Sequence, residues 1–371
     1  MPIFMDRHDV SEAVTAEIVA DLHQKDLKIQ HKFNCKGLTY WFDGKRKTAF
    51  CLVEAPDKES IQKMHDQAHG EVPHRIIEVD GALVESFLGR IEDPEKSKKT
   101  TLNIINDPAF RIILVAKIKH LSLEKFQDSD LAFLPESPQK FITNTVLEFK
   151  GRIVKQKNDY FLLSFISVSK AILCALKLQE GFKENFQSIS KPCFKLQIGL
   201  CAGIPVSEKE GIFEDTIQMA ERLCSIVKAD IAITSEVGDL YESENLNQPV
   251  NSKYVTKLPK LQEKFLNCLL DFMEKEWNNP ALTTNEFSQS LGLSKSQFYR
   301  KMISLTGVSP NSFIKLYRLQ KAIELMMKNN GNISEIAYET GFATPAYFSK
   351  CFQKVYHILP SVYAKSLHPQ S

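Results

Sequence analysis

Residues 333–355 read ISEIAYETGFATPAYFSKCFQKV, and this stretch decides the fold of the C-terminal part of the chain. Apolar residues at helical spacing in Ile333–Ala337 predict one short helix, and Gly341 predicts a tight turn after it. Thr344 is a suitable N-cap residue and Pro345 suits the first helical position, so a second helix is expected to follow. The stretch therefore predicts a helix-turn-helix motif.

The same pattern occurs once before, about 49 residues earlier in the chain. Leu282–Leu291 is predicted to be a helix, Gly292 a turn, and Ser294 the N-cap of a second helix that ends at Gly307. A long helix with an apolar stripe, Ser312–Lys328, is expected to separate the two copies. Two such motifs on a rigid spacer can enter successive major-groove segments on one face of DNA, about one helical turn apart.

In these motifs the chain resembles the AraC-type transcription regulators over residues 264–366. The resemblance rests on Ile333–Ala337, Gly341-Phe342, Tyr347–Lys350 and Phe352. It implies a DNA-binding domain over residues 262–368 and a sequence-specific transcription regulator whose partner is double-stranded DNA. His357 and Leu359 stand where the family usually has glycine and serine before its final proline.

The second helix of each motif has a core face and an outward face. Phe298 and Met302 are four residues apart and are expected to face the core, as are Phe348 and Phe352 in the second copy. Arg300 is then directed outward and is the best candidate for a two-bond contact with guanine. For each single residue, a solvated surface position is the alternative. The predicted DNA-binding residues are Lys295, Ser296, Tyr299, Arg300, Ala346, Ser349, Lys350 and Gln353.

Charge divides the chain in a way that agrees with this prediction. Residues 1–95 contain 12 Lys and Arg against 18 Asp and Glu, whereas residues 251–371 contain 15 against 8. A basic C-terminal segment fits polyanion binding at that end only. The longest apolar stretch, residues 160–178, is interrupted by Ser164, Ser167, Ser169 and Lys170, and the first residues lack the features of a signal peptide. Eight scattered cysteines without a CxxC pair fit a reducing compartment, so a cytoplasmic location is expected.

Residues 1–95 are predicted to form a small α+β domain of the ferredoxin-like type. Strands are expected at Pro2–Met5, Lys47–Val53 and Arg75–Val79. One helix is expected over Ser11–Lys32 with Ser11 as its N-cap, and another from Asp57 to His69.

This first domain contains six of the nine histidines of the chain. His65 and His69 are four residues apart, so they share a helix face at a spacing at which two imidazoles can bind one metal ion. Cys35 and Cys51 can add thiolates suited to nickel, copper or zinc. Surface histidines on amphipathic helices are the alternative. The candidate metal ligands are His8, His23, His65 and His69.

The first domain also resembles a family of small nickel-responsive, ferredoxin-like bacterial proteins. The resemblance lies in Met5–Asp9, Leu38–Asp43 and Cys51–Asp57. It implies nickel or another divalent transition metal as an effector, and it does not say which residues are the ligands. A metal-binding protein that only buffers the ion is one alternative function for the chain.

The middle part, residues 108–242, is a second predicted α+β domain, flanked by linkers at 96–101 and 242–260. Its expected strands are Arg111–Ile118, Gly151–Lys155, Tyr160–Phe165, Leu196–Leu200 and Ile231–Thr234. Its expected helices are Val168–Leu178 and Asp215–Val227. It resembles a class III nucleotide cyclase domain at Gly151–Lys155, Asp159, Phe165, Gln197–Gly199, Gly203, Phe213, Gln218 and Arg222-Leu223.

That resemblance implies two metal ions held between two aspartates. Asp159 fits one aspartate position, but Lys117 stands at the other, where its ammonium repels a divalent cation. Gln218 replaces the family's usual asparagine, although Arg222 matches the transition-state arginine. Asn158 and Tyr160 replace the glycines that usually flank the hairpin aspartate. A non-catalytic dimerising or ligand-sensing module is therefore expected, with an active cyclase fused to a DNA-binding domain as the alternative.

Taken together, the sequence predicts two α+β, ferredoxin-like domains followed by an all-α tandem helix-turn-helix domain. The expected function is that of a one-component transcription regulator, not an enzyme, controlled by a small molecule or a metal sensed in the N-terminal domains. A homodimer formed through the middle part is also expected.

Overall fold

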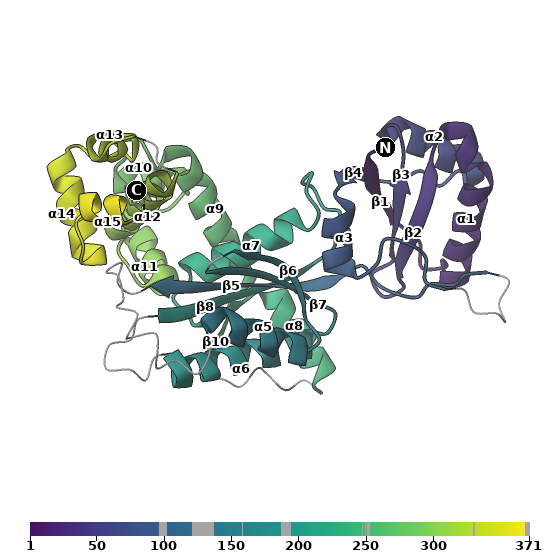
Figure 1. The fold of residues 1–371 in the computed structure, drawn as a ribbon, viewed down its shortest axis with the longest axis horizontal. Coiled ribbons are helices and arrows are strands. Elements are labelled where there is room, and N and C mark those ends of the chain that lie inside the picture. The colour runs from purple at the N-terminus through teal and green to yellow at the C-terminus, as the bar shows by residue number, and fades with distance from the viewer. Residues whose placement is uncertain are drawn as a thin grey trace.

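The computed structural model describes most of the chain: residues 1–95, 102–120, 137–157, 159–186, 194–246, 248, 250, 253–328 and 331–367. One sheet with its helices lies at one end of the molecule, a helical part lies at the other, and a larger sheet lies between them (Figure 1). This agrees with the predicted fold class. The predicted linker 96–101 and Asn158 fall outside the described residues.

The first sheet has the strand order β2-β3-β1-β4 and is antiparallel at each pairing. Two crossover helices in a βαββαβ sequence give the ferredoxin-like topology that was predicted. The elements are β1 (Ile3–Asp9), α1 (Ala16–Ile29), η1 (Gln30–Phe33), β2 (Lys36–Asp43), β3 (Thr48–Glu54), α2 (Lys58–His69), β4 (Arg75–Val79) and α3 (Gly81–Leu88).

The two helices of this domain differ in how well their ends were predicted. Helix α2 begins after Asp57, whose side chain accepts a hydrogen bond from the backbone of Ser60, and it ends at Gly70 with φ of 81°. The prediction that Ser11 caps α1 is wrong. The backbone carbonyl of Ser11 instead accepts a hydrogen bond from the Val14 backbone N–H in a turn. The hydroxyl of Thr15 caps the helix.

The second sheet has the order β10-β9-β8-β5-β7-β6, with parallel pairings only between β8, β9 and β10. Its elements are β5 (Arg111–His120), α5 (Pro138–Glu148), β6 (Arg152–Lys157), β7 (Tyr160–Phe165), α6 (Val168–Phe186), β8 (Phe194–Gly203), α7 (Glu214–Ile226), β9 (Ile231–Ile233), α8 (Ser235–Glu244) and β10 (Val255–Lys257). The expected linker over 242–260 is wrong where β10 pairs with β9. Helix α6 also extends beyond Leu178, because Phe182 and Phe186 continue its buried stripe.

The C-terminal part is entirely helical. It consists of α9 (Lys260–Glu276), α10 (Thr284–Ser290), α11 (Lys295–Thr306), α12 (Pro310–Met327), α13 (Ile333–Glu339), α14 (Pro345–Tyr356) and α15 (Pro360–Leu367). The turn after α14 closes although His357 replaces a glycine, because His357 adopts φ of 63° and donates its backbone N–H to Gln353 O at 2.9 Å. Among the described residues, no helix is long and apolar enough to cross a bilayer.

Hydrophobic cores connect the three parts unequally. One core joins Phe87 of the first domain to Phe213 and Val115 of the second. Another joins Leu223 on α7 to α9–α11 and the first half of α12. The core of the second helix-turn-helix motif is separate, and its buried members lie between Leu319 and Tyr363. The second motif is therefore stabilised mainly by hydrophobic contacts among its own residues and those of the second half of α12.

Candidate functional site

The first helix-turn-helix motif consists of α10 and α11. Thr283 and Ser294 each begin a helix with a reciprocal capping box, and Gly292 makes the turn with φ of 64°. Phe298 is 1% exposed and Met302 is fully buried, as their spacing predicted. These contacts fix which side of α11 faces solvent.

The outward face of α11 carries a polar and aromatic set. Lys295, Ser296 and Arg300 are exposed, and the ring of Tyr299 is 52% exposed. All four residues lie on the helix that the motif presents outward, so they are free of the core. The face combines two cations with hydroxyl groups, which suits contacts with phosphates and base edges.

The second motif, α13 and α14, repeats this construction. Asn332 begins α13 with a capping box, and the Thr344 hydroxyl accepts a bond from the Tyr347 backbone at the start of α14. Phe348 and Phe352 are fully buried. The remaining predicted contacts are exposed at Ala346, Lys350 and Gln353 and half-buried at Ser349.

In the middle domain, the positions that resemble cyclase residues make contacts within the chain. Lys117 on β5 donates from Nζ to Ser225 Oγ at 2.9 Å. Gln218 on α7 accepts a hydrogen bond from Lys209 Nζ. Asp159 lies in the turn before β7, opposite the lysine-bearing strand. The lysine ammonium thus holds a place on β5 where a metal-binding carboxylate would be needed.

Arg222, which was compared with a cyclase arginine on sequence alone, is directed at α9. Its side chain is 5% exposed. Nη1 donates to Asn267 Oδ1 at 2.7 Å, and Nη2 donates to Asp271 Oδ1 at 2.6 Å and to Glu274 Oε1 at 3.4 Å. The guanidinium therefore attaches α9, the first helix of the C-terminal part, to α7.

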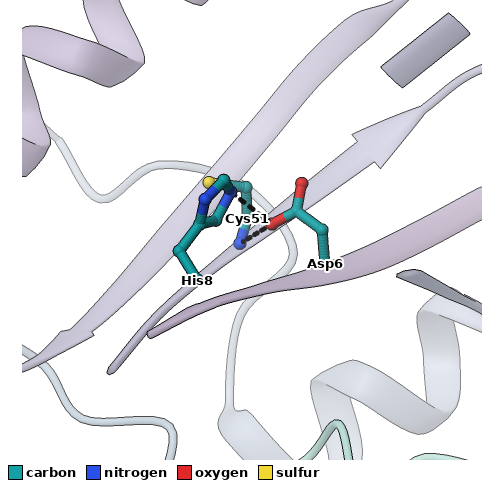
Figure 2. Close-up of side chains that lie close together, drawn as sticks. All are labelled: Asp6, His8 and Cys51. Atoms are coloured by element: carbon teal, nitrogen blue, oxygen red, sulfur yellow. Dashed lines mark hydrogen bonds and ion pairs between the residues drawn. The ribbon is translucent and has the colours of Figure 1, made fainter. Parts of the chain in front are cut away.

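The first domain contains a group of candidate metal-ligand side chains, buried Asp6 and Cys51 and half-buried His8 (Figure 2). Asp6 and His8 alternate on β1 and so share one face of the sheet, and Cys51 is the partner of Asp6 on β3. Asp6 Oδ1 accepts the Cys51 backbone N–H at 2.9 Å and lies 3.4 Å from His8 Nε2. One ligand atom from each of the three residues lies within 4.8 Å of the other two.

A second group, Asp26, His65 and His69, adjoins the first. His65 Nε2 lies 3.0 Å from Asp6 Oδ2, while its Nδ1 lies 3.2 Å from both His69 Nε2 and Asp26 Oδ2. Asp26 is on α1 and the two histidines are on α2, so the group joins two helices beneath the sheet. We call these six residues the histidine–carboxylate cluster.

Charge inside the cluster is balanced by pairing. Burial lowers the pKa of His65, but hydrogen bonds to Asp26 and Asp6 outweigh this and raise its pKa to about 10. Burial likewise raises the pKa of Asp6, yet the charge on His8 and hydrogen bonds with His65 hold it well below its ordinary value. At neutral pH, His65 is thus a cation between two carboxylates.

The donor atoms of the cluster fit a transition metal. Among the described residues, the buried Nε2 of His8 and Oδ1 of Asp26 make no well-aligned hydrogen bond, although they lie 3.4 Å from Asp6 Oδ1 and 3.2 Å from His69 Nε2. Imidazole nitrogen, carboxylate oxygen and thiolate sulfur are ligands that divalent first-row metals accept. Burial and then the charges on Asp6 and Asp26 raise the pKa of Cys51 well above its ordinary value, so an ion must displace a proton to bind sulfur.

The structure brings together only part of the predicted ligand set. His8, His65 and His69 belong to the cluster, whereas His23 belongs to neither metal-ligand group and lies with Nε2 3.6 Å from Asp93 Oδ2. Asp6 and Asp26 were not among the predicted ligands. For Asp6 a signal existed, because residues two apart on a strand point to the same face.

Two family models match the chain. Residues 4–79 match the family described as nickel responsive protein SCO4226-like, and residues 287–366 match a helix-turn-helix domain family. The chain is thus similar to SCO4226-like proteins near its N-terminal end and to helix-turn-helix domains near its C-terminal end.

This chain covers less than a third of the length of each of the two curated relatives described here. Histidine kinase P4 of Formosa agariphila is 37% identical over 117 residues, which are 30% of this chain and 8% of that protein. The HTH-type transcriptional regulator MtrA of Neisseria gonorrhoeae is 32% identical over 97 residues, 26% of this chain and 31% of that protein. A solved adenylate/guanylate cyclase/hydrolase from Silicibacter pomeroyi is 25% identical, with a TM-score of 0.31, and covers 38% of this chain and 83% of that one.

Proposed function

We propose that this protein is a sequence-specific DNA-binding transcription regulator whose first domain binds a divalent transition metal. The observation that carries the proposal is the pair of capped helix-turn-helix motifs, each with a buried aromatic face and an exposed polar face, joined by α12. The basic charge of residues 251–371 supports a polyanionic partner. Because that partner is DNA, we place the protein in the cytoplasm.

Both outward faces can contact DNA in chemically distinct ways. Arg300 offers two parallel N–H donors that match O6 and N7 of guanine, and Lys295 offers a charge for a backbone phosphate. On α14, the exposed methyl group of Ala346 suits the thymine methyl, and Lys350 suits guanine or phosphate. Specificity is therefore assigned to both motifs.

Replacing Arg300 tests this assignment. We expect Arg300→Ala to cost about 1–3 kcal/mol of DNA-binding free energy and to relax the preference at one base pair. Lys301→Ala is the matched control, because Lys301 loses the same charge from the same helix but lies over the Phe265 ring at 5.3 Å. Sites selected from a random DNA pool and gel-shift titration measure both effects. An equal loss on every sequence would assign Arg300 to a phosphate.

The metal would be held by the histidine–carboxylate cluster. Asp6, His8 and Cys51 offer one set of three ligand atoms, and Asp26, His65 and His69 offer a second set beside it. His23 is left out because its imidazole faces Asp93. A divalent ion held there would supply positive charge beside the carboxylates of Asp6 and Asp26 and would require the ligating imidazole nitrogens to be deprotonated, so we expect binding to alter contacts among β1, α1 and α2.

Calorimetric titration with Ni²⁺ and with Zn²⁺ tests the metal site. We expect the wild type to bind and the double variant His65→Ala/His69→Ala to lose at least about tenfold in affinity, since two of the ligands are gone. The double variant His31→Ala/His74→Ala is the control, because both of those histidines are exposed. Identical isotherms for wild type and the His65/His69 variant would refute the site, and the DNA-binding assignment would stand unaffected.

We assign the middle domain a non-catalytic, dimerising role. Lys117, Gln218 and Arg222 are all engaged within the chain, which argues against nucleotide cyclisation. Leu147 on α5 and Leu173 on α6 are apolar and 60% and 46% exposed, as a face for a second copy requires. We expect a dimer in sedimentation velocity at micromolar concentration, and Leu147→Glu to give a monomer. A wild-type monomer would contradict this role.

A further inference from the structure

One guanidinium connects the segment before the first helix-turn-helix motif to the second motif. Arg318 lies midway along α12, and its Nε donates to Trp277 O at 2.7 Å while Nη2 donates to Asn279 O at 2.6 Å. Both acceptors belong to the end of α9 and the loop that leads into the first motif. Nη1 donates to Gly341 O at 2.9 Å, and Gly341 is the turn of the second motif. The arginine therefore links the segment that leads into the first motif to the turn of the second motif.

The second motif also approaches the α9–α10 loop very closely at this point. Gly341 has φ of 75°, and a Cβ atom there would lie 2.8 Å from Asn278 O and 3.1 Å from Arg318 Cζ. Only glycine allows this approach without displacement. The three carbonyl groups thus converge on a half-buried guanidinium at the place where the motifs meet.

Helix α12 alone does not fix how the motifs are oriented. Phe313 and Ile314 belong to the core of the first motif, while Leu319 and Ile323 belong to the separate core of the second. Because α12 is continuous, it sets the distance between the two motifs. The rotation of the second motif about the axis of α12 is limited only by contacts with residues outside this helix. Arg318 lies between these two sets of residues and supplies such a contact in both directions.

We propose that Arg318 is a positioning residue that sets the angle between α11 and α14 and so determines the base-pair spacing this protein accepts. The inference rests on the proposed DNA-binding function. One added base pair moves the second DNA segment by about 3.4 Å and rotates it by about 34°. A rigid pair of motifs cannot follow that change, whereas a loosened pair can. Charge-assisted bonds to three carbonyls, in the fixed fork of a guanidinium, provide the rigidity.

The test uses the full chain and the DNA site that the wild type selects from a random pool. Three duplexes carry the selected spacing, one base pair more and one base pair fewer between the two contacted segments. The variants are Arg318→Gln and Arg318→Lys; the lysine keeps the charge but has a single nitrogen that cannot reach all three carbonyls. Lys321→Gln is the matched control, since Lys321 loses one charge from the same helix and pairs with Glu324 of α12.

We expect the wild type and Lys321→Gln to bind the altered spacings at least about tenfold more weakly than the selected one. For both Arg318 variants, affinity should differ by less than about threefold among the three duplexes. An unchanged spacing profile in the folded Arg318→Lys variant, or an equal loss on all three duplexes, would overturn the inference while leaving DNA binding intact. A wild type that selects no sequence would overturn the proposed function and this inference together.

Discussion

Phe348→Ala is expected to unfold the second helix-turn-helix motif while the rest of the chain stays folded. Phe348 is fully buried, and the centroid of its ring lies 5.1 Å from the ring centroid of Phe342 and 5.8 Å from that of Phe352. Removing a buried aromatic ring costs about 3–5 kcal/mol. A core made by so few residues has little stability to lose, because small units bury a small share of their surface.

DNA affinity should fall by about 100-fold or more in this variant, since the second motif then adds neither base nor phosphate contacts. Phe298→Ala is the matched comparison: the same ring is lost from the equivalent place in the first motif. That core continues into Leu223 and Val227 of the middle domain, so the first motif should loosen together with its neighbours.

Hydrogen exchange followed by mass spectrometry separates the two cases. In Phe348→Ala, fast exchange should be confined to residues 331–367, whereas in Phe298→Ala it should extend into α7 and α9. If the amides of Phe348→Ala are protected as in the wild type, or if the whole chain exchanges at once, the second motif does not unfold independently of the rest of the chain and the prediction is wrong.

The helix-turn-helix motifs were predictable because their signals are local. Capping residues such as Ser294 and Thr344 act within three residues of themselves, and the spacing of Phe348 and Phe352 alone identifies the buried face. The same holds for the end of α2 at Gly70. Each of these features depends on a few consecutive residues, so no tertiary contact had to be known.

The histidine–carboxylate cluster was only half predictable, because its members meet through tertiary packing. Asp26 meets His65 and His69 only when α1 lies beside α2, and nothing in the spacing of α1 indicates that pairing. His23 shares a helix with Asp26 but faces Asp93, which comes 70 residues later in the chain. Arg222 likewise acquires its role from residues on α9, which sequence spacing did not indicate.

Asp6→Asn is expected to destabilise the first domain by about 3–5 kcal/mol, the range for breaking a buried ion pair. Asp6 is fully buried, accepts a hydrogen bond from the Cys51 backbone and faces His65 and His8. The asparagine keeps the shape but leaves a protonated His65 with one carboxylate instead of two. Asp9→Asn is the control on the same strand. Its exposed pair with Arg7 should matter by less than about 1 kcal/mol.

The loss should depend on pH in a defined direction. The pKa of Asp6 is lowered on folding, so its contribution is present above the ordinary value of 3.8 and is lost as the pH falls below it. The pKa of His65 is raised, so its contribution is present below 6.5 and is lost as the pH rises through about 10. The difference between wild type and Asp6→Asn should therefore be largest between these two ordinary values.

Fluorescence of Trp41, which is buried in β2, can follow urea unfolding of the first domain in a Trp277→Phe background with a chelator present. When Ni²⁺ replaces the chelator, it should stabilise the Asp9→Asn protein in proportion to the logarithm of the metal concentration, and should stabilise Asp6→Asn much less. Equal stability of the two variants without metal would show that Asp6 is not the anchor of the cluster. Equal stabilisation by Ni²⁺ would show that it is not a ligand, because a buried carboxylate that binds the ion cannot be replaced by an amide without weakening the site.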